Sequence, residues 1–470
     1  MNYSDYQLKI FDFISNEEGH GVVNAVAGSG KTTTAVEMIK FFNSLLTGRF
    51  MAFNRHIADE LSKRLPFPAS TCNSFGWRIA LSQLTPKPIF KQFKNQQLIP
   101  KEMFKYKNIV CRLVSLFKNM AFFTVEDAKA NFESVTDRLG IDYPDKEEFF
   151  TLLWDVYERS INMTHIMDYD DQKFMPLKLG LDIPQSDYLI IDEYQDICEI
   201  ENQLALGSCQ HGRVIVFGDP DQCIYSFKGT TPGSMQNFDG THLPLSICYR
   251  CPKNVVLEAK KIVPRIEYFD GNIDGVVDTI SSADFHKMVG NGDLVLCRVT
   301  LYLVKSCLGF IRQGRKAFVQ GREIGKNLIS LVDQIGEDTD RISVFNFNLD
   351  QYFIKKSEYL TNLNKEMELS NLKDRVDSIK ALMADCQNVK QLKSNIQDVF
   401  IDDGTGIKHM TIHKSKGLES GKDNNVFIIK PELIPHPKAI DLDEENRLKY
   451  VAITRARKGL FYVDEQKSSF

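Results

Sequence analysis

The sequence lacks any apolar run that approaches the ~18 residues needed to cross a membrane. Its first twenty residues, MNYSDYQLKIFDFISNEEGH, have no basic start, long apolar core or small-residue cleavage site, so they do not form a signal peptide. It also lacks internal repeats and low-complexity tracts. We therefore expect a soluble globular protein of the cytoplasm, without a membrane partner.

Cysteine is sparse and charge is nearly balanced. The ten cysteines are scattered along 470 residues, whereas disulfide frameworks are typical of short secreted chains, so we expect reduced thiols. The net charge of −4 excludes a surface that is basic all over, but it is compatible with a locally basic groove for nucleic acid. The chain length suits roughly two to four domains.

A glycine-rich turn follows a β-branched run at residues 22–26, and apolar residues with helical spacing come after it. A strand, a turn and a helix form the setting in which GSGKT is credible as a phosphate-binding loop. Lys31 would neutralise the β- and γ-phosphates, and Thr32 would hold Mg²⁺. Ala25 stands where the strict motif has glycine, and a plain glycine turn before a helix is the alternative. The predicted ATP ligands of the loop are Ala27, Gly28, Ser29, Gly30, Lys31, Thr32 and Thr33.

Two further apolar runs end in polar residues. Residues 188–191, YLII, are typical of a strand buried on both faces of a parallel sheet. Asp192 and Glu193 follow it; the first would complete the Mg²⁺ site, and the second would polarise the attacking water. An acidic loop without function is the alternative for such a pair alone. After residues 214–217, GDPDQ places Gln222 where an amide could sense the γ-phosphate.

An aromatic ring beside a cation, Phe227 and Lys228, lies just beyond Gln222. Such a pair can stack a base and hold its phosphate. Taken alone, the pair would more often be ordinary packing.

In their order along the chain, these segments resemble the motifs of UvrD/Rep-like superfamily 1 DNA helicases. The resemblance rests on AVAGSGKTTT, MAFNRHIADEL, STCNSFG, IDEYQD, GDPDQCIYSFKG, LSICYRCP, LVLCRVT, MTIHKSKGLE and EENRLKYVAITRARKGL. It spans nearly the whole chain, and the ordered set is specific where each motif alone is not. The departures are Asn73, where the family usually has histidine, Tyr194 at a variable position, and Phe227, where many members carry tryptophan.

The resemblance implies an enzyme that uses ATP and Mg²⁺ and binds single-stranded and tailed duplex DNA. It assigns catalysis to Lys31, Asp192, Glu193, Gln222, Arg250 and Arg455. It adds further nucleotide contacts at Gln7, Tyr249, Gly417 and Glu419, and implies DNA contacts at Phe53, Asn73, Tyr225, Phe227, Lys228, Arg298, Thr300 and His413.

Cys248 and Cys251 flank Tyr249 and Arg250 with the spacing of a metal or redox pair. One such pair supplies two of the four ligands of a structural zinc. In the family the aromatic stacks on adenine and the arginine reaches the γ-phosphate, so we expect the cysteines to fill positions that need only be small.

The resemblance predicts an α/β fold with two RecA-like P-loop NTPase cores, ATP between them, and a mainly helical insertion in each core. The strands of the second core are expected in DLVLCRV, NVFIIKP and GLFYVDE. The expected boundaries are 1–84 and 186–244 for the first core, 85–185 for its insertion, 245–334 and 406–470 for the second core, and 335–405 for its short insertion.

In the second insertion, a spacing of three to four residues predicts one long amphipathic helix. Its apolar positions are Leu360, Leu363, Met367, Leu372, Val376, Ile379 and Met383. Packing on its own core is at least as good an interpretation as a DNA contact. This insertion is short for the family. Because ten residues follow Leu460, we expect no appended nuclease domain.

The favoured function is a 3′-to-5′ single-stranded DNA translocase and helicase in replication, recombination or repair. The small insertions favour a phage-encoded protein in a bacterial host cytoplasm. One alternative is a DNA-sensing ATPase subunit of a larger complex, such as an anti-phage defence assembly, with partner proteins. A P-loop small-molecule phosphotransferase is a weaker alternative, because it would not need the motifs of the second core.

Overall fold

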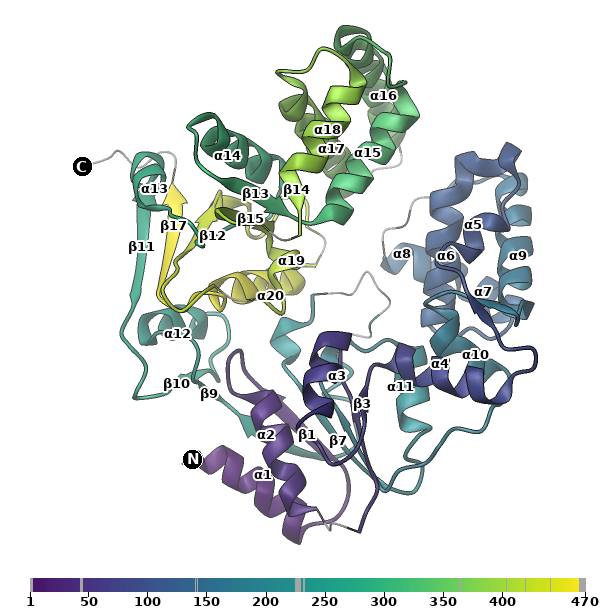
Figure 1. Cartoon of the computed structure of the whole chain (residues 1–470), viewed down its shortest axis with the longest axis vertical. Coiled ribbons are helices and arrows are strands. Elements are labelled where there is room, and N and C mark those ends of the chain that lie inside the picture. The colour runs from purple at the N-terminus through teal and green to yellow at the C-terminus, as the bar shows by residue number, and fades with distance from the viewer. Residues whose placement is uncertain are drawn as a thin grey trace. The chain divides into compact units, whose positions relative to one another are not determined.

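The computed structural model describes residues 3–42, 45–139, 141, 143–224, 230, 233–362, 365–402, 404–418, 420–439 and 441–464. The chain forms two compact units, the first of Met1–Val26 and Gly30–Ser246, and the second of Ala27–Ser29 and Ile247–Phe470. Each unit is built on a parallel β-sheet with helices beside it (Figure 1). The expected α/β class with two P-loop-type cores is confirmed.

The sheet of the first unit has six strands in the order β3-β2-β6-β7-β1-β8, all paired in parallel. The three strands expected from sequence lie side by side in it, each within one residue of its predicted bounds. The strands are β1 (Gly21–Ala25), β2 (Gly48–Met51), β3 (Ala69–Ser70), β6 (Tyr188–Ile191), β7 (Arg213–Gly218) and β8 (Thr241–Leu245).

Alternate side chains of these strands enter two different cores. Ile190 and Ile215 pack with α1 (Asp5–Asn16) and α2 (Lys31–Met38), whereas Leu189, Ile191 and Val216 pack with α4 (Cys72–Gln83) and α11 (Glu199–Leu206). Both faces of the sheet are therefore covered, which explains why these strands are apolar without alternation. A further helix of this unit, α3 (Arg55–Ser62), follows β2.

Between α4 and β6 the chain is mainly helical. The elements are β4 (Ile89–Phe90), α5 (Lys94–Gln97), α6 (Lys107–Asn119), α7 (Val125–Ala130), α8 (Phe132–Arg138), α9 (Glu147–Asn162), β5 (Ile166–Met167) and α10 (Asp171–Lys178). They enclose a core to which α6 and α9 contribute more buried apolar side chains than any other element.

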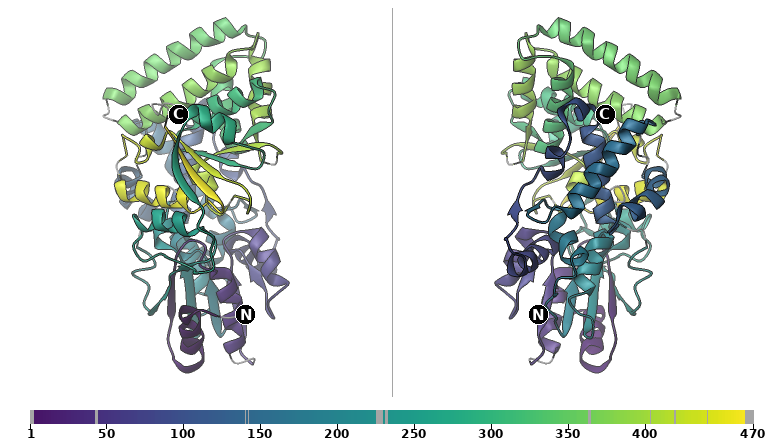
Figure 2. Two further views of the ribbon diagram at one scale, coloured as in Figure 1. Left: turned by 90° about the vertical axis from the view of Figure 1, so that its left-hand side faces the viewer. Right: turned by 90° about the vertical axis from the view of Figure 1, so that its right-hand side faces the viewer.

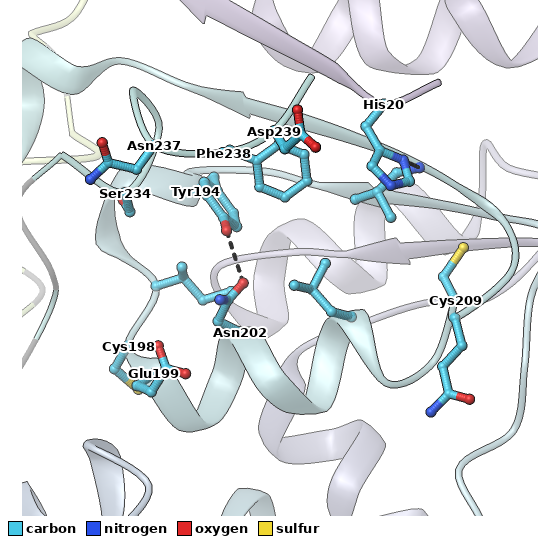
Figure 3. Close-up of a pocket in the computed structure, with 14 residues that line it drawn as sticks. His20, Tyr194, Cys198, Glu199, Asn202, Cys209, Ser234, Asn237, Phe238 and Asp239 are labelled. Carbon is cyan, nitrogen blue, oxygen red and sulfur yellow. Dashed lines mark hydrogen bonds between the residues drawn. The ribbon is translucent and has the colours of Figure 1, made fainter. Parts of the chain in front are cut away.

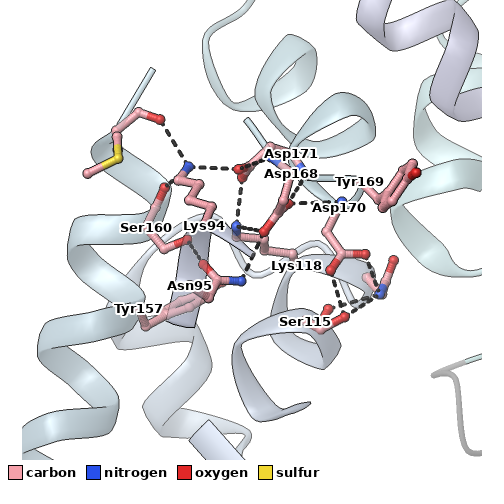
Figure 4. Close-up of polar contacts among 12 residues, drawn as sticks. Lys94, Asn95, Ser115, Lys118, Tyr157, Ser160, Asp168, Tyr169, Asp170 and Asp171 are labelled. Carbon is pink, nitrogen blue, oxygen red and sulfur yellow. Dashed lines mark hydrogen bonds and ion pairs between the residues drawn. The ribbon is translucent and has the colours of Figure 1, made fainter. Parts of the chain in front are cut away.

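A buried ionic cluster joins α5, α6 and α10 of this region (Figure 4). Asp171 receives Lys94 Nζ at 2.7 Å on one carboxylate oxygen and Lys118 Nζ at 2.6 Å on the other. Burial would raise the pKa of Asp171, but the charges of the two lysines outweigh it and lower that pKa. Because all three side chains are almost fully buried, the charges depend on one another for solvation.

The second unit has a seven-stranded parallel sheet in the order β11-β17-β16-β12-β15-β13-β14. The strands expected in DLVLCRV, NVFIIKP and GLFYVDE are confirmed as β12, β16 and β17. The bounds are β11 (Val276–Ser281), β12 (Leu294–Cys297), β13 (Ala317–Gln320), β14 (Phe400–Ile401), β15 (Ile407–Thr411), β16 (Val426–Ile429) and β17 (Gly459–Asp464). Its flanking helices include α12 (Lys253–Lys260), α13 (Ser282–Met288), α14 (Thr300–Arg312), α19 (Ile412–Ser415) and α20 (Leu442–Ile453), and β9 (Ile247–Cys248) pairs with β10 (Glu267–Tyr268).

Between β13 and β14 lie four helices, α15 (Arg322–Ile335), α16 (Ile342–Asn362), α17 (Glu366–Met383) and α18 (Val389–Val399), at one end of the second unit (Figure 2). The single long helix predicted over residues 360–383 is wrong, because α16 ends at Asn362 and α17 begins at Glu366. Asparagine favours helix ends, since its side chain competes for backbone hydrogen bonds. Leu363 lies outside the described residues.

The apolar side chains predicted for that helix come from two helices that share one core. Leu360 of α16 and Leu372, Val376 and Ile379 of α17 are buried together with side chains of α14, α15 and α18. For these four residues the packing interpretation is confirmed. In the described part of the chain, no helix combines the length and apolar character that a membrane crossing requires.

Candidate active site

Three neighbouring strands of the first sheet lead to the candidate site at their carboxyl ends. The order β6-β7-β1 brings together Asp192 and Glu193 after β6, the GDPDQ segment after β7, and the glycine-rich turn after β1. In an open parallel sheet, ligands bind at this edge. The sheet order therefore places Lys31, Asp192 and Glu193 next to one another within the first unit.

Lys31 is the first residue of α2, and its ammonium group pairs with Glu193 at 2.9 Å. Burial would lower the pKa of Lys31, but the charges of Glu193, Asp192 and Asp219 outweigh it and raise that pKa. Lys31 is therefore a cation held among three carboxylates, where a phosphate group would compete for it.

Glu193 adopts a left-handed backbone conformation with φ 53° and ψ 40°. Residues other than glycine seldom adopt this conformation, and it costs on the order of 1 kcal/mol. The strained turn lets Glu193 N donate to Asp192 Oδ1 at 2.9 Å and aims the Glu193 carboxylate at Lys31. Backbone strain at a predicted catalytic base fits a site selected for chemistry.

Asp192 is almost fully buried, and burial together with the neighbouring Glu193 charge raises its pKa to about 6 despite Lys31. A divalent cation would offset this penalty, so the residue suits a Mg²⁺ ligand. Thr32, next to Lys31, is only partly buried and could be the second one. No group of three or more His, Cys, Asp or Glu side chains that could hold a metal occurs among the described residues. The oxygen donors of Thr32 and Asp192 fit Mg²⁺, which takes few protein ligands and shares its shell with phosphate oxygens and water.

The turn residues fit a phosphate group as well. Ser29 Oγ is buried without a hydrogen-bond partner in the described part of the chain, and a hydroxyl in that state gains from a phosphate acceptor. Gly30 has a φ of 78° and open space where a side chain would begin. This position combines a glycine conformation with room for a ligand.

A hydrogen-bond network absent from our sequence predictions connects the ends of β6 and β7. Gln195 Nε2 donates to Glu193 Oε2 at 2.5 Å, and Gln195 Oε1 accepts from Asp219 N at 3.0 Å. Gln222 Nε2 donates to Asp219 Oδ2 at 2.6 Å, so the predicted γ-phosphate sensor points at Asp219 here. The sequence signal for Gln195 was its position two residues after the predicted base, which no spacing rule singles out.

The two predicted adenine contacts, Gln7 and Tyr249, each interact with residues near them in the fold. Gln7 Oε1 accepts from Ser4 N at 3.0 Å within the cap of α1, and Gln7 Nε2 donates to Thr34 Oγ1 at 2.9 Å. Tyr249 is more than one-third exposed and its ring lies 5.1 Å from that of Phe269. Their adenine roles stay predictions.

The predicted γ-phosphate arginines differ in exposure. Arg455 is buried in the second unit and donates to the carbonyls of Val451 at 3.0 Å and Leu418 at 2.6 Å. Arg250 is partly exposed. Gly417 has a φ of 78°, and Glu419 lies outside the described residues.

Both cysteines of the motif around Arg250 are buried. Cys251 N donates to Cys248 Sγ at 3.4 Å, and Cys251 Sγ donates to the carbonyl of Thr454 at 3.5 Å. The neighbouring Cys251 thiol, together with the Cys251 and Arg250 N–H groups, favours the Cys248 thiolate and lowers the pKa of Cys248 to about 7. The thiols thus pack inside the second unit.

Among the predicted DNA contacts that the structure describes, Phe53 presents an exposed ring, 46% accessible. Asn73 donates to the carbonyl of Tyr169, and Arg298 makes a two-pronged ion pair with Glu445 at 2.8 and 2.9 Å. Tyr225, Phe227 and Lys228 lie outside the described residues.

Two further predicted DNA contacts lie near Arg298 in the sequence or in space. Thr300 N, at the start of α14, donates to Asp374 Oδ2 at 3.1 Å. Burial and the nearby Arg298 charge lower the pKa of His413 to about 3, so its imidazole is neutral. All of the DNA roles stay predictions.

A cavity of about 560 Å³ in the first unit lies beside α11 and is separate from this site (Figure 3). Tyr194 and Phe238 form an aromatic pair at its wall, and Tyr194 Oη donates to Asn202 Oδ1 at 2.8 Å. Among the described residues, its lining includes Glu199 and Asp239 and no lysine or arginine. The charge of this cavity does not suit phosphates, so Lys31 and its neighbours remain the candidate nucleotide site.

Comparison with known proteins identifies relatives over most of the chain. A family model described as the UvrD-like helicase C-terminal domain matches residues 145–466, and one described as an AAA domain matches residues 12–228. The chain is 21% identical to the ATP-dependent DNA helicase PcrA of Staphylococcus epidermidis over an alignment of 604 positions, gaps included, which covers 95% of this chain and 82% of that protein. It is 26% identical to the ATP-dependent DNA helicase Rep of Buchnera aphidicola over 275 residues, which cover 51% of this chain and 38% of that protein.

Proposed function

Because this chain belongs to the UvrD-like helicase family, we propose that it is an ATP-dependent DNA helicase that moves 3′ to 5′ along single-stranded DNA. The observation that carries this proposal is the cluster of Lys31, Asp192 and Glu193 at the carboxyl edge of the first sheet. The relatives named PcrA and Rep, which are ATP-dependent DNA helicases, support it.

In the proposed reaction, Lys31 binds the β- and γ-phosphates, and Thr32 with Asp192 holds Mg²⁺. When bound, Mg²⁺ neutralises phosphate charge during transfer. Glu193 accepts a proton from the attacking water. Arg250 and Arg455 are proposed to stabilise the charge of the γ-phosphate, as arginine fingers do.

The ion pair between Lys31 and Glu193 makes nucleotide binding precede the activation of water. The triphosphate carries more charge than one carboxylate, so it displaces Glu193 from Lys31 when it binds. The Glu193 carboxylate then becomes available to water only after the nucleotide has arrived. Hydrolysis without a correctly seated phosphate is therefore disfavoured.

DNA binding is proposed to rest on stacking rather than on a broad basic surface, since the net charge is −4. Phe53 offers an exposed ring, and stacking contributes about 1–3 kcal/mol per base with little sequence preference. The cellular role proposed for this motor is in DNA replication, recombination or repair.

The test combines ATPase and strand-displacement assays on duplexes with a 3′ or a 5′ single-stranded tail. The wild type should hydrolyse ATP faster with single-stranded DNA and should displace the strand of the 3′-tailed duplex. Lys31→Ala should do neither. Preferential unwinding of the 5′-tailed duplex would refute the polarity, and DNA-stimulated ATPase without strand displacement would favour the DNA-sensing ATPase instead.

A further inference from the structure

Gln195 is a buried side chain that contacts one carboxylate oxygen of the predicted base, while Lys31 contacts the other. Its exposed fraction is 2%. Lys31 Nζ lies 2.9 Å from Glu193 Oε1, whereas Gln195 Nε2 lies 2.5 Å from Glu193 Oε2. The two oxygens of the Glu193 carboxylate thus have different partners. A bound nucleotide would compete for Lys31, whereas Gln195 would keep its hydrogen bond to Glu193.

The orientation of the Gln195 amide is fixed by the end of β7. Asp219 N can only donate, and it donates to Gln195 Oε1 at 3.0 Å, so the NH₂ group must face Glu193. Gly218 permits this approach, because a Cβ at that position would clash with Gln195 Oε1. The close passage of β7 therefore determines that Glu193 receives a hydrogen-bond donor.

A second contact ties Gln195 to the same segment. Cys223 Sγ donates to the Gln195 carbonyl at 3.3 Å, and Gln222 Nε2 donates to Asp219 Oδ2 at 2.6 Å. Residues 219–223 therefore hold both the backbone and the side chain of Gln195. A displacement of this segment would move the amide and, with it, the carboxylate of Glu193.

We propose that Gln195 is the positioning residue through which residues 219–223 set the orientation of Glu193, so that DNA binding raises the rate of ATP hydrolysis. The inference rests on the proposed function, and it specifies how the ATP site is regulated. Once the phosphates engage Lys31, Gln195 keeps Oε2 as a hydrogen-bond acceptor, and Oε1 is the oxygen that takes the proton from water. In the sequence, residues 219–223 are followed closely by three of the predicted DNA contacts, Tyr225, Phe227 and Lys228, which lie outside the described residues.

The central experiment compares Gln195→Met with Gln203→Met as the matched control. Gln203 Nε2 also donates to a nearby carboxylate, that of Glu199 at 2.7 Å, but this carboxylate lies outside the proposed reaction. Basal and DNA-stimulated kcat, KM for ATP and melting temperature are measured for both. Gln195→Met should lower the DNA-stimulated kcat about tenfold. This is part of the roughly 10²–10⁴-fold rate increase that a positioned general base provides. The ratio of the stimulated to the basal rate should also fall. KM should change less than about twofold, and Gln203→Met should behave as wild type.

A second variant keeps the test sharp if Gln195→Met is poorly folded. Gln195→Glu retains an acceptor for Asp219 N but places a second carboxylate beside Glu193. Lowering the pH protonates the introduced carboxyl, which can then donate to Glu193. Its activity relative to wild type should therefore recover as the pH falls from 8 to about 6, the direction in which a carboxyl near a like charge gains its proton. Gln195→Met should show no recovery.

Two failures are distinguishable. A wild type whose ATPase ignores single-stranded DNA would overturn the proposed function and the inference with it. A wild type that responds to DNA would overturn the inference alone if Gln195→Met keeps the full stimulation, or if its basal and stimulated rates fall in proportion with its melting temperature. Absence of pH-dependent recovery in Gln195→Glu would also count against it.

Discussion

Lys31 Nζ and Glu193 Oε1 lie 2.9 Å apart, so the cation expected to bind phosphate is paired with the base expected to activate the attacking water. Both side chains are mostly shielded from water, being 13% and 25% exposed. ATP binding therefore has to break a contact within the protein, and the carboxylate competes directly with the nucleotide.

Glu193→Gln should separate binding from hydrolysis. The amide cannot accept a proton, so kcat should fall about 10²–10⁴-fold. Removing the competing charge should also tighten ATP binding about threefold, which corresponds to a weak, partly exposed ion pair. Single-turnover hydrolysis and titration with a fluorescent ATP analogue measure the two effects. Hydrolysis at the wild-type rate would show that Glu193 is not the base.

Arg298 and Glu445 provide a test of whether a predicted DNA contact also has a structural role. Glu445 is 4% exposed and accepts from both Arg298 and His436 N. Arg298→Ala leaves the buried carboxylate of Glu445 without its cationic partner and should lower the free energy of unfolding by about 3 kcal/mol. Combining it with Glu445→Gln should restore much of that loss in chemical denaturation. If Arg298 contacts DNA, affinity for single-stranded DNA should stay weak in the double variant; recovery of affinity would assign Arg298 to stability alone.

His409 should make the second unit sensitive to acid. It is fully buried, and burial lowers its pKa to about 4 although it lies 3.0 Å from Ser306 Oγ. In the unfolded chain the His409 imidazole becomes protonated near pH 6.5, whereas in the folded chain it stays neutral until about pH 4. The free energy of unfolding therefore decreases as the pH falls from 6.5 toward 4. The loss should reach about 2 kcal/mol at pH 5. His409→Gln keeps a polar group at this position and should flatten the dependence of unfolding free energy on pH over this range; an unchanged slope would contradict the assignment.

Asp171→Asn should be severely destabilising. It removes the charge that two buried lysines share, Lys94 and Lys118, and should lower the free energy of unfolding by about 3–5 kcal/mol. Asp155→Asn is the matched control, because Asp155 pairs with Arg159 at the surface and such pairs contribute at most about 1 kcal/mol. Equal melting temperatures for the two variants would show that the buried cluster is not a source of stability.

Sequence predicted three strands of each sheet, because central parallel strands are apolar on both faces, as at Leu189, Ile190 and Ile191. The glycine-rich turn and the pair of Asp192 and Glu193 were predictable because each is defined by residue types that are adjacent in the sequence. Gln195 was not, since its role depends on a backbone donor at Asp219 that no sequence spacing reveals.

The helix prediction over residues 360–383 failed for a related reason. Leu360 and Leu372 enter one core from two separate helices, α16 and α17. Periodicity reports which faces are apolar, but it does not report whether the chain turns back between them. The pair of Arg298 and Glu445, far apart along the chain, was likewise beyond any local pattern.

The position of β1 between β7 and β8 has a consequence for synthesis on the ribosome. Gly21 of β1 pairs with Ile215 on one side and with Thr241 on the other. Both partners are made some two hundred residues later, after the whole helical region between α4 and β6 has been translated. Long-range parallel pairing of this kind forms slowly. The strand β1, which supports the phosphate-binding turn, is thus among the first to be synthesised and among the last to pair with its neighbours. A nascent chain should therefore bind nucleotide only once residue 245 has left the exit tunnel.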